Sequence, residues 1–223
     1  MVLTRKHIRA ASRLYMRAWH RLEVTGCENL PLHEPALLLG NHASFLDLPA
    51  VMAVVPYEDI TFLASARQVR KPVIGQVLRV LEAIPVARNG RDISAIRALL
   101  QALEQGRVVG VAVEGSISIS GRLGTVHPVL AKFLVQADVP LVPLGICGSY
   151  DALPPGTLIP RRRRIAIRIG EPLRIPPATP QQVAAARIRA AIAVLLPPEQ
   201  RPLPDSLSQG SICSHAHDKL SSP

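Results

Sequence analysis

Residues 35–47 read PALLLGNHASFLD, an apolar run that passes through a short polar loop into a helix-like pattern. The run from Pro35 to Gly40 predicts a buried β-strand, because it is short, continuous and apolar. The following stretch, Phe45 to Val54, predicts a helix, for which Ser44 is a suitable N-cap residue. A strand, a loop and a helix in this order predict an α/β unit with polar side chains at the end of the strand.

Two of those polar side chains, His42 and Asp47, suit acid–base chemistry. His42 lies in the loop and Asp47 falls at the third helical position, so the carboxylate can reach back to the imidazole. Such a pair supplies a base and its orienter but no nucleophile, which suits a reaction whose substrate brings the hydroxyl. On spacing alone, Asp47 could simply favour the helix dipole, and His42 could be a hydrogen-bonded loop residue.

The whole string Asn-His-x-Ser-x-x-Asp after an apolar strand resembles the first motif of the glycerolipid acyltransferases, the 1-acylglycerol-3-phosphate O-acyltransferase family. The resemblance runs in the right order from roughly Glu23 to Leu173. Residues 81–90, LEAIPVARNG, resemble the family's strand that ends in a phosphate-binding arginine, here Arg88. Residues 139–143, VPLVP, match a later motif without change.

The third family motif, Phe-Pro-Glu-Gly-Thr-Arg-Ser, is matched in part by residues 112–118, AVEGSIS. Glu-Gly is kept and serine replaces threonine, whereas Val113 stands in place of proline and Ile117 in place of arginine. An isoleucine cannot hold a phosphate, so the departure bears on the acceptor's head group more than on acyl transfer itself.

The resemblance implies transfer of an acyl chain from an acyl thioester to the hydroxyl of a lysophospholipid such as 1-acylglycerol-3-phosphate, in phospholipid biosynthesis. His42 would take the hydroxyl proton and Asp47 would hold the imidazole tautomer. Arg88 would hold the acceptor phosphate. Acyl-CoA or acyl-carrier protein would be the co-substrate, and no cofactor or metal is expected.

The third motif supplies the other expected substrate contacts, Glu114, Gly115 and Ser116. Backbone N–H groups near Gly115 would stabilise the developing oxyanion. Glu114 would orient the glycerol, brace the phosphate-binding arginine, or merely cap its loop. Arg122 is a candidate phosphate ligand that replaces the missing arginine, and His127 stands where many family members carry lysine.

Composition agrees with one α/β domain, a mostly parallel central sheet with helices on both faces, expected at residues 23–196. Hydrophobic residues make up 48% of the 223, yet no uninterrupted apolar run reaches the roughly 18 residues typical of a transmembrane helix. No signal peptide is apparent, and three scattered cysteines favour a reducing compartment. Residues 197–223, rich in proline and serine, predict a disordered tail.

Residues 1–22 predict a basic amphipathic helix, because arginines recur every four residues from Arg5 to Arg21 without any acid. Apolar residues at helical spacing, Ile8 and Tyr15 among them, are expected on the opposite side. Such a helix either packs on the domain or lies on an anionic membrane surface. Arg161 to Arg164 could extend the same surface, which predicts a peripheral protein on the cytoplasmic face of a membrane.

The formal net charge of +10 also raises the class of nucleic-acid-binding proteins. Aromatic residues are only 3% of the chain, which leaves little for base stacking, and no nucleic-acid-binding motif is present. Two alternatives to the phosphate-bearing acceptor remain: an acyltransferase for another lysolipid, such as a lyso-ornithine lipid, and a non-catalytic membrane-binding relative.

Overall fold

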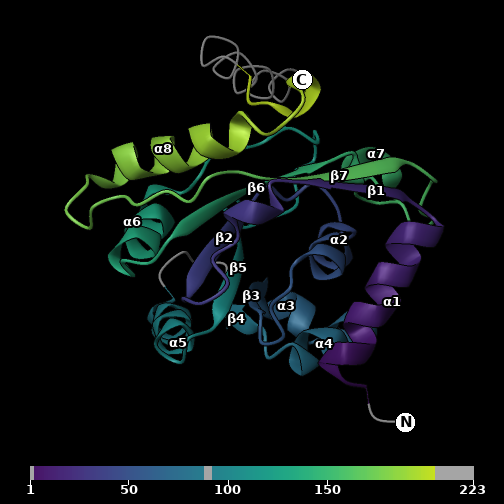
Figure 1. The fold of residues 1–223 in the computed structure, drawn as a ribbon, viewed down its shortest axis with the longest axis horizontal. Coiled ribbons are helices and arrows are strands. Elements are labelled where there is room, and N and C mark those ends of the chain that lie inside the picture. The colour runs from purple at the N-terminus through teal and green to yellow at the C-terminus, as the bar shows by residue number, and fades with distance from the viewer. Residues whose placement is uncertain (1–2, 88–91, 204–223) are drawn as a thin grey trace, which may run out of the picture.

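The computed structural model describes residues 3–87 and 92–203 (Figure 1). Within these ranges the chain forms a seven-stranded sheet in the order β1-β7-β6-β2-β5-β3-β4. Paired strands are parallel except β6 and β7, which run antiparallel. The predicted α/β class with a mostly parallel sheet is therefore confirmed. The strands are β1 (Arg21–Thr25), β2 (Ala36–Gly40), β3 (Thr61–Ser65), β4 (Ile84–Val86), β5 (Val108–Ala112), β6 (Leu141–Cys147) and β7 (Arg164–Ile169).

The strand predicted for residues 35–40 is β2, which lies near the middle of the sheet between β5 and β6. All five of its residues are buried, which explains the continuous apolar run, since both faces of the sheet are covered. Leu37 and Leu39 join one core, whereas Ala36 and Leu38 join the other. The described helices are α1 (Arg5–Ala18), α2 (Asp47–Val54), α3 (Ala66–Val69), α4 (Pro72–Val80), α5 (Ile93–Glu104), α6 (Pro128–Gln136), α7 (Ser149–Ala152) and α8 (Gln181–Ala193), with 3₁₀ turns at Cys27–Asn29 and Pro198–Gln200.

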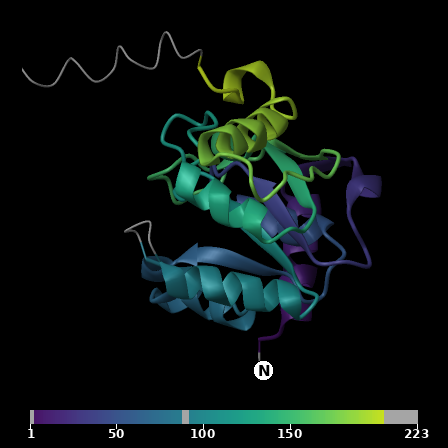
Figure 2. The same cartoon turned by 90° about the vertical axis from the view of Figure 1, so that its left-hand side faces the viewer.

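The helices form two layers, one on each face of the sheet. Buried side chains of α5, α6 and α8 pack with Leu37 and Leu39, and those of α1 and α2 pack with Ala36 and Leu38. Both views show α8 beside α6, away from α1 (Figures 1 and 2). The carboxyl ends of β2, β5, β3, β4 and β6 share one edge of the sheet, the edge at which sites form in such folds.

Three local expectations need correction. The first helix after β2 begins at Asp47 rather than Phe45, and its N-cap is Leu46 without a side-chain bond. The sequence of residues 68–81 predicts one helix, a prediction weakened by Pro72 and Gly75. The structure instead has two helices, α3 and α4, because Pro72 lacks an N–H and opens a new helix at its first position. Residues 179–182, TPQQ, have the sequence pattern of a capping box, but Pro180 is the N-cap residue of α8 and no side-chain cap bond forms there.

Helix α1 is part of the domain, and its arginine stripe does not face away from it. Thr4 and His7 form a capping box at its start, and Ile8, Ser12 and Met16 are its buried residues. The apolar side expected through Ile8 and Tyr15 is therefore only partly the buried one. Residues 1–22 also do not form a separate segment, because β1 begins at Arg21 inside the sheet.

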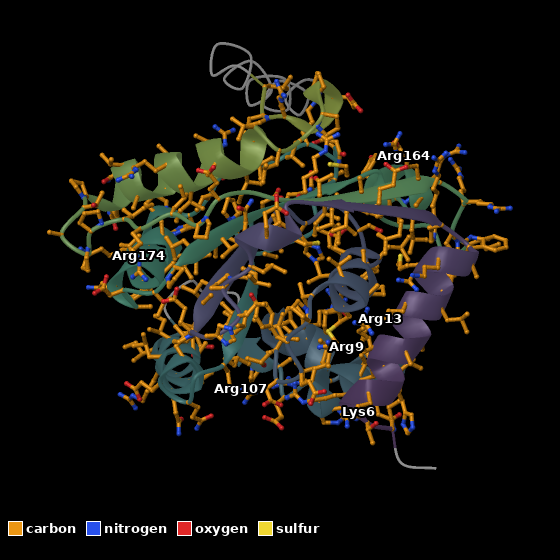
Figure 3. The ribbon with its side chains drawn as sticks, in the orientation of Figure 1. Lys6, Arg9, Arg13, Arg107, Arg164 and Arg174 are labelled. Atoms are coloured by element: carbon orange, nitrogen blue, oxygen red, sulfur yellow. The ribbon has the colours of Figure 1, made fainter. Side chains whose placement is uncertain are left out.

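Arginines of α1 hold backbone carbonyls of the domain. Arg5 donates to the carbonyls of Ile60 and Leu81 at 2.7 and 2.9 Å. Arg9 and Arg13 lie on the side of α1 that faces α2 (Figure 3). Their acceptors are the carbonyl oxygens of Pro56 and Tyr57 for Arg9, and of Ala53 for Arg13.

The C-terminal tail is expected to begin at residue 197, but residues 197–203 pack on the domain. Gln200 is 7% exposed, its carbonyl accepts from the Leu123 N–H at 2.8 Å, and its side chain accepts from the Gly148 N–H at 3.1 Å. Residues 204–223, the rest of the predicted tail, lie outside the described residues.

Candidate active site

The loop between β2 and α2 brings His42 and Asp47 into contact. His42 Nδ1 donates to Asp47 Oδ2 at 2.7 Å, the same oxygen that accepts the backbone N–H groups of Ala43 and Ser44 at 2.8 and 2.9 Å. Three donors thus fix a carboxylate whose side chain is only 5% exposed, whereas the imidazole is 28% exposed. The hydrogen bond at Nδ1 leaves Nε2 free to exchange a proton with a bound molecule.

Glu114, two residues past the end of β5, holds this loop through its carboxylate. Its Oε1 accepts the backbone N–H of His42 and its Oε2 accepts that of Gly124, both at 2.9 Å. Burial raises the pKa of Glu114. The hydrogen bonds from the two N–H groups lower it, but by less, so the pKa lies above its usual value. Of the three roles considered, the described contacts are those of a carboxylate that caps its loop.

The residues after Glu114 turn their backbone toward the histidine. Gly115 has φ +68°, a conformation that favours glycine, and its N–H donates to the Ala112 carbonyl at 3.1 Å. The N–H of Ser118 donates to the His42 carbonyl at 2.7 Å. The N–H groups of Ser116 and Ile117 have no acceptor among the described residues, so both are free donors beside this turn.

A cavity of about 1020 Å³ opens beside His42 and runs under α1. His42, Gly115 and Ile117 line it at the carboxyl edge of the sheet; Ile8 of α1 and Leu3, just before that helix, line it as well. The start of α1 lies at the opposite edge, because Arg5 binds the Ile60 carbonyl just before β3. The cavity is therefore long, and its wall is mainly apolar. It is lined by side chains of β2, α2, β3, α4, β5 and β6, among them Leu38, Val51, Met52, Phe62, Ala64, Val77, Leu78, Leu144 and Ile146.

Two cations in the cavity wall, Arg67 and Lys71, were missed by the sequence reasoning. They follow β3 at the same edge as His42, and no described carboxylate forms an ion pair with either. The rule that sites gather after strand ends applies to them as well, since residues 59–64, DITFLA, predict a strand that leads into this segment. They were passed over because no motif marked them.

Other expected site residues are placed elsewhere. Arg122 turns toward the C-terminal segment, where its guanidinium donates to the Arg201 carbonyl at 3.1 Å, and it does not line the cavity. His127 caps α6 by accepting the Val129 N–H at 3.3 Å. Arg88 lies outside the described residues. Within residues 3–87 and 92–203 there is no group of three His, Cys, Asp or Glu side chains arranged to hold a metal ion.

Known proteins are similar to this chain over the part that contains His42, Asp47 and Glu114. The family model described as "Acyltransferase" matches residues 21–147, a range that contains β1 to β6. The solved structure of the 1-acyl-sn-glycerophosphate acyltransferase PlsC from Thermotoga maritima superposes with a TM-score of 0.69 at 20% identity, covering 86% of this chain and 79% of that one. The predicted resemblance is thereby confirmed, as is the fold.

Relatives at the sequence level carry related names. The chain is 26% identical to a 1-acyl-sn-glycerol-3-phosphate acyltransferase of Bacillus subtilis, over 68% of this chain and 73% of that protein. It is 25% identical to the chloroplastic 1-acyl-sn-glycerol-3-phosphate acyltransferase BAT2 of Brassica napus, over 62% of this chain but only 41% of that protein. A lyso-ornithine lipid O-acyltransferase of Pseudomonas aeruginosa is 28% identical over 54% of this chain and 46% of its own length.

Proposed function

Because the chain belongs to the acyltransferase family, we propose that it transfers an acyl chain from an acyl thioester to the hydroxyl of a lysophospholipid. The observation that carries the proposal is the 2.7 Å bond from His42 Nδ1 to Asp47 Oδ2 beside a long apolar cavity. An oriented base serves an acceptor hydroxyl, and an apolar cavity accommodates an acyl chain.

In the proposed reaction, His42 Nε2 takes the proton of the acceptor hydroxyl as its oxygen attacks the thioester carbonyl. Asp47 holds the imidazole by its Nδ1–H and stabilises the imidazolium that forms. The tetrahedral intermediate then collapses by breaking the carbon–sulfur bond, and the departing thiolate takes the proton from His42. A positioned general base contributes about 10²–10⁴ to the rate of such a step.

The negative charge that develops on the thioester carbonyl oxygen needs hydrogen-bond donors close to that oxygen. Ser116 and Ile117 line the cavity next to the turn at Gly115, and their free N–H groups suit this role. Glu114 would contribute by holding the His42 backbone and the Gly124 loop in register, not by touching the substrate.

The acceptor is proposed to carry a phosphate near Arg67 and Lys71, which line the cavity together with His42. A planar guanidinium and an ammonium suit a phosphomonoester, which carries close to two negative charges at neutral pH. Arg88 keeps the phosphate-binding role that the family resemblance implies.

A second acceptor class is favoured by one observation. Ile117 lines the cavity where the family's third motif places an arginine, so one fixed cation is missing beside the histidine. A lysolipid with less negative charge, of the kind that the name of the Pseudomonas aeruginosa relative describes, would tolerate this loss. The acyl donor is proposed to be acyl-CoA or acyl-carrier protein.

The deciding experiment incubates the pure 223-residue chain with acyl-CoA or acyl-carrier protein and a panel of lysolipids, and identifies products by mass spectrometry. The proposal predicts a diacyl product with at least one acceptor, and none with the His42→Ala variant. Ile117→Arg should lower the KM for lysophosphatidic acid selectively if the phosphate is bound beside it. A folded protein that acylates no lysolipid from either donor would contradict the proposal.

A further inference from the structure

A surface loop, residues 153–160, carries an apolar tip directly in front of four arginines. Leu158 and Ile159 are 94% and 81% exposed, and Arg161 to Arg164 follow after one proline. Adjacent large apolar side chains are seldom left open to water without a partner. An apolar tip flanked by arginines has the composition of a segment that enters a lipid–water interface.

The loop is already folded for such a role. Gly156, with φ +85°, allows a tight turn in which the Thr157 N–H and hydroxyl both donate to the Pro154 carbonyl, at 3.1 and 2.7 Å. The Arg161 N–H closes the base of the loop on the Ala152 carbonyl at 2.7 Å. Ordering the loop on binding would therefore cost little conformational entropy.

The end of α1 adjoins the arginines that follow this loop. His20 is 2% exposed; one ring nitrogen bonds the Arg163 carbonyl and the other the Tyr15 hydroxyl, both at 3.3 Å. Trp19, beside it, is 47% exposed. A groove at this junction is lined by Arg17, His20, Arg21, Arg162, Arg163 and Arg164.

Most of the positive charge at this junction is not neutralised within the protein. Glu23 pairs with Arg21 and Arg164, the latter at the start of β7 in Figure 3. In the described part of the chain, no carboxylate lies within ion-pair distance of the other arginines at this end, which are Arg17, Arg161, Arg162 and Arg163.

The loop shares an edge of the molecule with the cavity beside His42. Its first carbonyl, that of Leu153, accepts the Ser44 hydroxyl at 2.8 Å, and the Tyr150 hydroxyl donates to the Ile119 carbonyl at 2.8 Å. Ile119 and Phe45 line the cavity and are 86% and 46% exposed, so they form an apolar rim at its opening.

We infer that these side chains seat the protein on an anionic lipid bilayer, with the cavity opening toward the lipids. The docking patch is defined as Trp19, Leu158 and Ile159 with Arg17, Arg161, Arg162 and Arg163. This inference goes beyond the proposed acyl transfer, because it concerns where the protein binds and not what it catalyses. It also restricts the membrane contact on α1 to the end of that helix near Arg17, because the other three arginines of its stripe, Arg5, Arg9 and Arg13, bind carbonyls of the domain.

The first test measures co-sedimentation with phosphatidylcholine vesicles that contain or lack phosphatidylglycerol. Arg162→Gln with Arg163→Gln should weaken binding to the anionic vesicles roughly thirty-fold, or about 2 kcal/mol, since each arginine near such a surface contributes about 1 kcal/mol. The charge-matched control, Arg97→Gln with Arg187→Gln on the exposed faces of α5 and α8, should bind as the unaltered chain does.

The apolar tip is tested in the same way. Leu158→Ser with Ile159→Ser should weaken binding by about tenfold or more, because insertion buries apolar side chains. Val183→Ser with Val194→Ser, exposed positions within α8 and at its C-cap, serves as the matched control. None of these variants touches the proposed catalytic groups, so acylation of a dispersed short-chain lysolipid should be unchanged if the protein is an acyltransferase.

Trp19 gives a direct readout, because it is the single tryptophan of the chain. Its emission should shift to the blue and become protected from iodide on addition of anionic vesicles, and not with pure phosphatidylcholine. Unchanged emission together with full vesicle binding by both loop variants would overturn the inference. A higher KM for acyl-carrier protein in the arginine variant, with vesicle binding intact, would instead assign the patch to an acidic protein.

Discussion

Replacing Asp47 by asparagine isolates the electrostatic part of the proposed mechanism. The amide oxygen of asparagine can take the place of Oδ2 and still accept from His42 Nδ1 and from the Ala43 and Ser44 N–H groups. The geometry of the loop should therefore persist, while the negative charge is lost. Asp47→Asn is thus expected to act on the charged imidazolium and not on the position of the ring.

The size of the effect follows from the distance. The imidazolium exists only once His42 has taken the hydroxyl proton, so its attraction to Asp47 stabilises the transition state and not the ground state. Two unit charges about 4 Å apart at an effective dielectric constant of about 20 attract by about 4 kcal/mol. Losing that attraction corresponds to roughly a thousand-fold lower kcat, with KM almost unchanged.

Steady-state kinetics of acyl transfer with the best lysolipid, together with circular dichroism and thermal denaturation, measure this effect. Asp59→Asn, on an exposed turn before β3, is the matched control and should keep full activity. His42→Ala combined with Asp47→Asn should be no slower than His42→Ala alone, because Asp47 acts through the histidine. A folded Asp47→Asn protein whose kcat falls less than tenfold, or whose loss lies wholly in KM, would refute the reasoning.

Three further outcomes are expected. Burial raises the pKa of Glu114. The protonated group therefore stabilises the fold fully at pH values below the ordinary glutamate pKa, and this stabilisation is lost as the pH rises through the raised pKa. Glu114→Gln should flatten that part of a curve of Tm against pH. Ala64→Leu, which fills the cavity from β3, should shift the preferred donor toward shorter acyl chains, as measured by competition between acyl-CoAs of different length. Arg9→Gln with Arg13→Gln should lower Tm by about 4–8 °C, since each of these partly exposed arginines contributes about 1 kcal/mol through its bonding to carbonyls; an unchanged Tm would mean that these bonds do not hold α1.

Features set by neighbouring residues were predicted well from the sequence. The apolar run of β2 indicated a strand covered on both faces, and the order of strands and helices indicated a parallel sheet. The reach of Asp47 back to His42 also followed from the sequence. Its helix nevertheless begins at Asp47, because the carboxylate binds the N–H groups of Ala43 and Ser44 and holds that segment as a turn.

Features that depend on residues far apart in the chain were not predictable in this way. Helical spacing showed that the α1 arginines share one side, but not that carbonyl oxygens some fifty residues away, such as that of Pro56, would bind Arg9. Likewise, the spacing of the third motif placed Glu114 at a strand end without revealing that its two oxygens hold His42 and Gly124. The cavity required the packing of α1 on the sheet, so the cations Arg67 and Lys71 became visible only in the fold.

The role of His42 as the base is tested most directly by the turnover rate of His42→Ala, measured beside its melting curve. The account predicts a kcat lower by about 10²–10⁴ with KM for the acyl donor nearly unchanged, in a protein that melts as the unaltered chain does. A folded His42→Ala protein that retains more than about a tenth of the turnover rate would contradict it.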